Sequence, residues 1–95
     1  MAYSIHWKPL ADKQLDSVDD YLTFELQNPK AALDFLSLVH SKVALLAATG
    51  TKFRQGRILG THEYVISPTT ILVYRVVEKA KRIDILRLLP AAQNT

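Results

Sequence analysis

The first quarter of the chain shows two different spacings of apolar residues. Tyr3, Ile5 and Trp7 are separated by single polar residues, which is the period of a strand with one buried face. From Pro9 onward apolar residues recur every three or four positions, and proline suits the first turn of a helix because its missing N–H costs nothing there. We therefore predict a short strand over residues 3–7 and then a helix. The apolar stripe of this helix consists of Ala11, Leu15, Val18, Leu22 and Leu26.

A second helix is marked at both ends. Asn28 is a good N-cap, Pro29 fits the first helical position, and Gly50 is a typical stop. Because the link between the two helices is very short, they must run antiparallel as a hairpin. The main apolar stripe consists of Ala32, Phe35, Leu36, Val39, Val43 and Leu46. A further apolar set, made of Ala31, Leu38 and Leu45, widens this surface beyond one core contact, and we expect it to bind a protein partner.

The second half of the chain has the spacing of strands. Residues 63–66, 71–77 and 83–89 are rich in β-branched, aliphatic and aromatic side chains and are separated by short turns. Short links between strands imply antiparallel hairpins. Pro90 ends the last strand, and we expect residues 91–95 to be frayed.

Together these elements predict one α+β domain over residues 1–95, in the order β-α-α-β-β-β, with a two-helix antiparallel hairpin packed on a small antiparallel sheet. The chain has no cysteine, which excludes disulfides, thiolate zinc sites and cysteine nucleophiles. Its N-terminus does not resemble a signal peptide, and we expect that no apolar run approaches membrane-spanning length. The sequence therefore predicts a cytoplasmic protein that does not bind a membrane.

Charge is divided unevenly between the two halves. Residues 1–48 carry four lysines against six acids, a net charge of −2, whereas residues 49–95 carry eight basic residues against three acids, a net charge of +5. A basic half indicates an anionic partner such as nucleic acid or an acidic protein surface. The alternative is that these charges only keep a small protein soluble, and charge alone leaves both interpretations open.

The residue types that usually bind metals or cofactors form no recognisable set. His6, His40 and His62 lack metal-ligand spacing, and the sequence contains no Walker loop, dinucleotide fingerprint or nucleophile elbow. We therefore expect no metal, no cofactor and no small-molecule substrate.

Arginine remains as the candidate functional residue. Arg75 and Arg87 lie inside otherwise apolar strands, and arginine is rarely buried without a partner. Strict alternation places Arg75 on the side of Val73 and Arg87 on the side of Ile85. Either these arginines form internal salt bridges with Glu63 or Asp84, or at least one of them binds an external partner. The expected basic cluster consists of Arg57, Arg75 and Arg87, with His62 and Tyr64 at its margin.

Four segments of the second half follow one another in a recognisable order. They are residues 56–57 (GR), 60–66 (GTHEYVI), 71–76 (ILVYRV) and 83–89 (IDILRLL). This pattern resembles the RelE/ParE toxin superfamily, and most closely its ParE branch, also called plasmid-stabilisation proteins. The N-terminal strand and both helices fit the same family, so the resemblance covers nearly the whole chain.

The resemblance implies the toxin of a type II toxin–antitoxin pair, which a cognate antitoxin wraps and holds inactive. Relatives of the RelE type cut mRNA in the ribosome, whereas relatives of the ParE type inhibit DNA gyrase without known catalytic residues. Under this resemblance the arginine cluster would bind gyrase, with the ribosome and mRNA as the alternative target. The antitoxin would bind Ala31, Leu38 and Leu45.

Two departures from the ribonuclease branch favour the ParE branch. That branch tends to place arginine where Ile71 stands, and ionisable residues after the last strand, where residues 90–95 contain none. Because phosphodiester cleavage needs an acid, a base or charge stabilisation, we expect a non-enzymatic inhibitor with no catalytic residue. Many ParE relatives, however, have arginine in place of His62 and histidine near Leu89 and Pro90. A displaced ribonuclease site and a non-toxic interaction module remain the alternatives.

Overall fold

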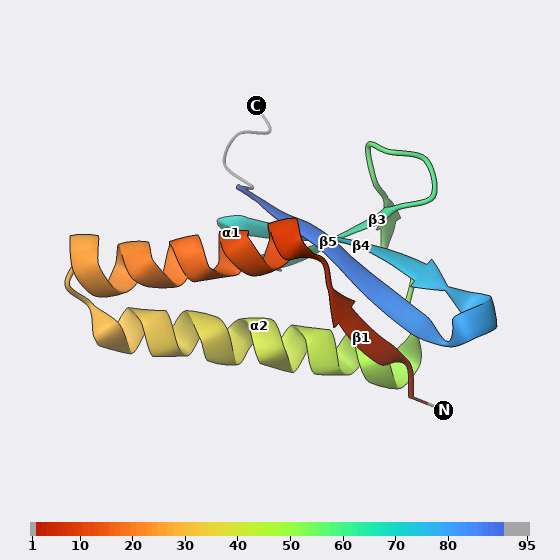
Figure 1. Cartoon of the computed structure of the whole chain (residues 1–95), viewed down its shortest axis with the longest axis horizontal. Coiled ribbons are helices and arrows are strands. Elements are labelled where there is room, and N and C mark those ends of the chain that lie inside the picture. The colour runs from red at the N-terminus through yellow and green to blue at the C-terminus, as the bar shows by residue number, and fades with distance from the viewer. Residues whose placement is uncertain (1, 91–95) are drawn as a thin grey trace.

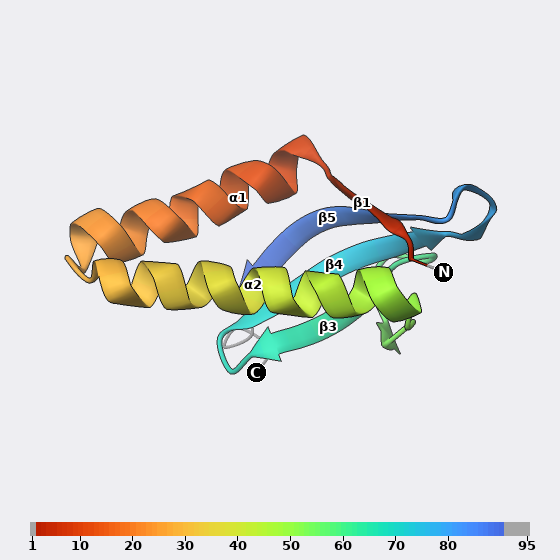
Figure 2. The same cartoon turned by 90° about the horizontal axis from the view of Figure 1, so that it is seen from below.

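The computed structural model describes residues 2–90 of the chain. The predicted tail, residues 91–95, lies outside this range. Two helices cover one face of a five-stranded sheet (Figure 1), and Figure 2 shows α2 lying over β3 and β4. The elements are β1 (Ser4–Trp7), α1 (Pro9–Asp20), a π-helical turn η1 (Tyr21–Glu25), α2 (Pro29–Thr49), β2 (Arg54–Gln55), β3 (His62–Ser67), β4 (Thr70–Val77), a 3-10 turn η2 (Glu78–Ala80) and β5 (Arg82–Pro90).

The start of α1 at Pro9 and both ends of α2 are those that the sequence predicts, whereas α1 ends at Asp20 and the π-helical turn that follows it was not predicted. The side chain of Asn28 accepts a hydrogen bond from the N–H of Ala31 at 3.1 Å, and Gly50 ends α2 in the left-handed conformation with φ of 64°. A side chain at position 50 would also collide with the ring of Tyr3, where the chain before β1 passes the end of α2. The α+β class and the antiparallel helix hairpin are thus confirmed.

The sheet is mixed, although short links predicted an antiparallel one. Its strand order is β1-β5-β4-β3-β2, and β1 pairs in parallel with β5, from Ser4 opposite Arg82 to Trp7 opposite Ile85. The hairpin rule applies only to strands joined by short turns, and β1 is joined to the rest of the sheet through two helices. The two-residue strand β2 was not predicted because so short a polar segment has no period.

A bulge in β5 reverses the side predicted for Arg87. Val73 pairs with Arg87 but the next residue, Tyr74, pairs with Ile85, so Leu86 is an extra residue in the ladder. Arg87 therefore lies on the face of Val73, and its predicted placement beside Ile85 is wrong. Alternation along a strand holds only until a bulge interrupts it.

Helix α1 is attached to β5 next to this bulge. The N–H of Leu88 donates a hydrogen bond of 2.8 Å to Oε1 of Gln14. Since β1 ends opposite Ile85, the following residues of β5 have no strand partner on that side among residues 2–90, and Gln14 satisfies one of their backbone groups.

The core lies between the helix hairpin and the sheet. It contains Ala11, Leu15, Val39, Val43, Leu46, Tyr64, Ile66, Leu72, Tyr74, Ile83, Ile85 and Leu88. Val18, Leu22 and Phe35 also belong to the predicted stripes but are only half-buried. The closed end of the helix hairpin projects past the sheet in both views, so that part of each stripe has no strand beneath it (Figures 1 and 2).

Helix α2 is more apolar than its core contacts require. With 21 residues it is long and apolar enough to cross a membrane by length and composition alone, so the expectation that no apolar run approaches this length is wrong. Only four of its residues are buried, namely Ala32, Val39, Val43 and Leu46. Much of its apolar surface is therefore left uncovered by the domain itself.

Candidate functional site

The face of the sheet turned away from the helices carries most of the basic side chains of the second half. The bulge in β5 and the alternation in β4 bring Arg87 and Arg75 to this side. We call this surface the open face. It is formed by Lys8, Arg54, Arg57, Glu63, Arg75, Arg82, Asp84 and Arg87.

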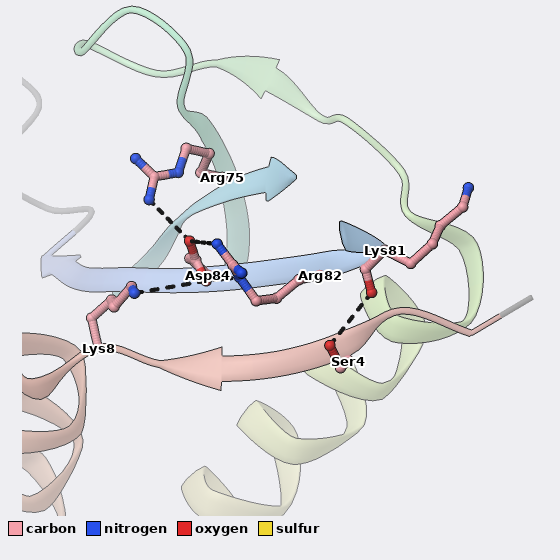
Figure 3. Close-up of polar contacts among 6 residues, drawn as sticks. All are labelled: Ser4, Lys8, Arg75, Lys81, Arg82 and Asp84. Carbon is pink, nitrogen blue, oxygen red and sulfur yellow. Dashed lines mark hydrogen bonds and ion pairs between the residues drawn. The ribbon is translucent and has the colours of Figure 1, made fainter. Parts of the chain in front are cut away.

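The first centre of the open face is Asp84, whose side chain has no exposed surface. It accepts a hydrogen bond from Arg75 Nη2 at 2.9 Å and one from Arg82 Nε at 2.9 Å, and Lys8 Nζ lies 4.0 Å away (Figure 3). Burial raises the pKa of Asp84, but the hydrogen bonds from Arg82 and Arg75 and the charges of Arg82 and Lys8 lower it by more, so the net pKa is below the usual value. The carboxylate therefore stays charged beneath three cations.

The second centre is Glu63, which is also buried. Its Oε1 accepts a hydrogen bond from Arg54 Nη2 at 3.1 Å. Its Oε2 accepts one from the backbone N–H of Arg57 at 3.2 Å, and Arg57 Nε lies 3.7 Å away. Both carboxylates of the open face thus hold arginines that reach the surface.

Arg87 lies on β5, three residues after Asp84 and in the same cross-strand row as Glu63. Arg87 pairs with Val73 of β4, and Val73 pairs in turn with Glu63 of β3. The side chain of Arg87 is half-buried and forms no hydrogen bond or ion pair within residues 2–90. Of the three arginines expected to cluster, Arg57 and Arg75 are therefore bound to internal carboxylates, and Arg87 is the one without such a partner in that range.

The structure places His62 and Tyr64 on the other side of the sheet, so their expected position beside the arginines is wrong. Tyr64 is buried and stacks on Phe53 with 4.0 Å between ring centroids. His62 stands opposite Tyr74, and these rings are 5.6 Å apart. Because side chains of a strand alternate, the neighbours of Glu63 must face the helices when Glu63 faces the arginines.

Tyr74 fixes the segment between α2 and β2 from inside the core. Its hydroxyl donates to the carbonyl of Thr51 at 2.6 Å and accepts from the N–H of Phe53 at 2.8 Å. Burial raises the pKa of this phenol, and the hydrogen bond from Phe53 offsets only part of that effect. The tyrosine is therefore a structural anchor of the chain that leads to the open face.

The second expected surface, Ala31, Leu38 and Leu45, forms one stripe along α2, because its members are seven residues apart. Ala31 and Leu38 are half-buried and Leu45 is 45% exposed. Lys42 lies on the same side, and its ammonium is 5.7 Å from the ring centroid of Tyr64, so the stripe borders β3. We call these three residues the α2 stripe.

The strand edge beside the α2 stripe has few partners. β2 pairs only with His62 and Glu63, and no other strand of residues 2–90 pairs with the outer side of β3. The remainder of β3, as far as Ser67, therefore offers backbone groups for an added strand.

Sequence patterns did not identify two exposed apolar groups. At the closed end of the hairpin, Phe24 is 70% exposed and lines a cavity of about 370 Å³ together with Ser17, Asp20, Tyr21 and Glu25. In the loop between β2 and β3, Ile58 and Leu59 are exposed. A signal for the second group was present, since two adjacent large aliphatic residues between Gly56 and Gly60 are unusual for a loop.

Comparison with protein families adds a decisive finding to this geometry. The family model described as the ParE toxin of type II toxin–antitoxin systems, parDE, matches residues 5–95. The chain belongs to the ParE toxin family. Its match covers both the open face and the α2 stripe, so these are surfaces of a ParE-family toxin.

Solved structures agree with the fold of this ParE-family toxin. The chromosomal ParDE system of P. aeruginosa matches with a TM-score of 0.78 and 24% identity over 94% of this chain and 96% of that chain. The RelBE2 toxin–antitoxin complex of Mycobacterium tuberculosis matches with a TM-score of 0.62 and 16% identity over 95% and 99% of the two chains. The E. coli DinJ–YafQ complex matches with a TM-score of 0.51 and 19% identity over 100% of both chains. Comparison with curated protein sequences finds no significant match.

Proposed function

We propose that this ParE-family toxin inhibits DNA gyrase by binding it through the open face. The observation that carries the proposal is the set of six basic side chains arranged around two buried carboxylates. Guanidinium groups keep their charge at all physiological pH values, so this face is a fixed positive surface. Such a surface suits an acidic patch on another protein, where charge complementarity directs association. The proposal places the toxin in the cytoplasm.

A binding role fits this face better than a catalytic one. Tyr64 and His62 face the helices, away from the arginines. The pKa of Asp84 is lowered by its arginines, which makes this carboxyl group a poor proton donor near neutral pH. The groups that remain around it bind and position anions, and they do not exchange protons readily.

One observation favours a second candidate, a ribosome-dependent endoribonuclease of the RelE type. His6 of β1 is exposed and stands opposite Asp84 in the parallel ladder, so an imidazole borders the basic cluster. Histidine is the residue that most often transfers protons near neutral pH. Under this second candidate, substitution of His6 by alanine abolishes mRNA cleavage.

Two assays with the purified toxin decide between the candidates. The first measures supercoiling of relaxed plasmid by purified gyrase as the toxin is titrated, and the second measures mRNA cleavage on translating ribosomes. We expect inhibition in the first assay and no cleavage in the second. Cleavage on ribosomes that is lost in His6→Ala, with gyrase unaffected, would replace the first candidate by the second.

We further propose that a cognate antitoxin binds along the α2 stripe and the adjoining edge of β3. The stripe offers apolar surface to an amphipathic helix, and the edge offers backbone groups to an extended segment. The incomplete burial of α2 supports this placement, because a partner that covers the helix buries apolar surface that the domain leaves in water.

A further inference from the structure

The loop between β2 and β3 stands apart from the rest of the surface. Its residues 57–60, which we call the tip loop, are separated from β2 by Gly56 alone. In Figure 1 the corresponding green segment projects beyond the sheet on the side away from both helices. Leu59 is 88% exposed, which is the highest value among the large apolar residues of the described chain, and Ile58 is 60% exposed.

The tip loop is held by hydrogen bonds to two buried polar residues, Thr61 and Glu63. The N–H of Gly56 donates to the carbonyl of Thr61 at 2.9 Å, and Thr61 donates to the carbonyl of Ile58 through its N–H at 3.1 Å and its hydroxyl at 2.6 Å. On the other side of the loop, Oε2 of Glu63 accepts a hydrogen bond from the backbone N–H of Arg57. These bonds close the loop at both ends and fix its backbone.

The glycines of this segment are required by the same geometry. A Cβ on Gly56 would collide with Oγ1 of Thr61, and Gly60 has φ of 85°, which side chains rarely allow. The chain thus uses two glycines, Thr61 and Glu63 to hold two aliphatic side chains in water. An ordered segment that presents apolar side chains loses little conformational entropy on binding, so its burial contributes efficiently to affinity.

We propose that the tip loop is an anchor that inserts Ile58 and Leu59 into an apolar pocket, bordered by carboxylates, on a folded target protein. The aliphatic side chains require an apolar pocket, because only there does their removal from water stabilise a complex. Arg54 lies in β2 and Arg57 is the first residue of the tip loop. Residues 54–63 contain these two arginines against one acid, Glu63, so the segment brings a formal net charge of +1 to the contact. This charge is complementary to acidic residues around the pocket.

A protein fits these observations better than a nucleic acid. Phosphates would pair with the arginines but would leave Leu59 and Ile58 in water, since affinity for a nucleic acid backbone comes from charge. The inference rests on the proposed function in that the partner is the target of the toxin, which is gyrase under that proposal. To that proposal it adds the tip loop as the contacting element and an apolar pocket bordered by carboxylates as the surface that receives it.

The experiment compares Leu59→Ser with Leu59→Met and with Leu33→Ser in the full-length toxin. Leu33 is a matched control, because it is 68% exposed and lies on α2 outside the α2 stripe. Each variant is titrated against purified gyrase in the supercoiling assay, and each is induced in cells to measure growth arrest. Thermal unfolding by circular dichroism checks that all variants are folded.

We expect Leu59→Ser to raise the half-inhibitory concentration about tenfold or more, as truncation of a buried anchor does. Leu59→Met keeps the apolar volume and should stay within about threefold of the unmodified toxin. Leu33→Ser should inhibit normally. Growth arrest should follow the same order.

Each other outcome has a definite meaning. Inhibition of gyrase that is equal in Leu59→Ser and the unmodified toxin overturns the anchor while the proposed function stands. A toxin that arrests growth without inhibiting gyrase refutes the proposed target. In that case, loss of growth arrest in Leu59→Ser together with its retention in Leu59→Met supports a tip-loop anchor on a target protein other than gyrase. Unchanged growth arrest in Leu59→Ser overturns the anchor. A toxin that neither inhibits gyrase nor arrests growth refutes both.

Discussion

The carboxylate of Asp84 lies fully buried between the guanidinium groups of Arg75 and Arg82. A buried acid inside a strand normally costs stability, and here three cations and two good hydrogen bonds offset that cost. The same residue also orients Arg75, which would otherwise be free to move in solvent. One acid thus determines both the local stability of β5 and the shape of the basic surface above it.

Substitution Asp84→Asn should lower the free energy of unfolding by about 1–3 kcal/mol at neutral pH. The loss stays below that of a fully buried pair because Arg75 is half exposed and can regain water. Asp34→Asn is the control, since Asp34 forms an exposed ion pair with Lys30 at 3.0 Å and should change stability by less than about 0.5 kcal/mol. Urea unfolding measures both, and equal small effects would contradict the role assigned to Asp84.

Comparison of the unmodified protein with Asp84→Asn also gives a test of pH dependence. The pKa of Asp84 is lower in the folded than in the unfolded chain, so its contribution to stability is complete above the unfolded value of 3.8 and is lost as the pH falls below it. The difference in stability between the unmodified protein and Asp84→Asn should therefore be constant near neutral pH and shrink below about pH 3.8. A difference that grows on acidification would reverse the assigned sign.

At the scale of elements, helices were predicted well and the sheet less well, for physical reasons. A helix is defined by local signals, and Asn28, Pro29 and Gly50 mark α2 in the structure as in the sequence. The parallel pairing of β1 and the bulge at Leu86 depend on contacts between distant segments. No local spacing of residues determines such contacts.

The two leucines Leu46 and Leu22 test which part of the hairpin supports the fold. Leu46 is fully buried above the sheet, whereas Leu22 lies near the projecting end and is only half-buried. Leu46→Ala should lower the free energy of unfolding by about 2–5 kcal/mol. Leu22→Ala should cost less than half as much. Chemical denaturation measures both, and an equal loss would show that the projecting end is packed as tightly as the core.

The α2 stripe gives a prediction about the partner. Leu45→Glu places a charge on a partly exposed position, so it should weaken binding of the cognate antitoxin by about tenfold or more while the thermal midpoint of the free toxin changes little. Leu38→Glu should act in the same direction with some loss of stability, because Leu38 is half-buried. Leu33→Glu, outside the stripe, is the control. Titration calorimetry decides, and antitoxin affinity unchanged in Leu45→Glu would exclude this placement.

At the scale of the whole molecule, the uneven charge of the sequence becomes a difference between two sides. The acidic first half supplies the helices, and the basic second half supplies four of the five strands found in residues 2–90, whose arginines gather on the open face. The residue types of the site were therefore predictable, but their partners were not. Whether an arginine binds Glu63 or Asp84, or neither, depends on register and on the bulge.

Arg87 provides the sharpest test of the open face as the target-binding surface. Arg75 is less suitable, because its removal also exposes Asp84 and confuses binding with stability. Arg87 has no internal ion pair within residues 2–90, so its truncation removes a surface charge and leaves the two carboxylate centres intact. Lys13→Ala on the exposed side of α1 removes the same charge from the opposite layer and serves as the control.

Arg87→Ala should raise the half-inhibitory concentration for gyrase about five- to thirtyfold, which corresponds to about 1–2 kcal/mol of binding energy. The loss should be graded, because a binding surface retains its other contacts when one is removed, whereas loss of a catalytic group stops a chemical step. Lys13→Ala should inhibit as the unmodified toxin does. If both variants inhibit equally, the open face is not the contact surface. If the toxin instead cleaves mRNA on ribosomes and Arg87→Ala abolishes that cleavage, Arg87 stabilises charge in a reaction and the binding mechanism is wrong.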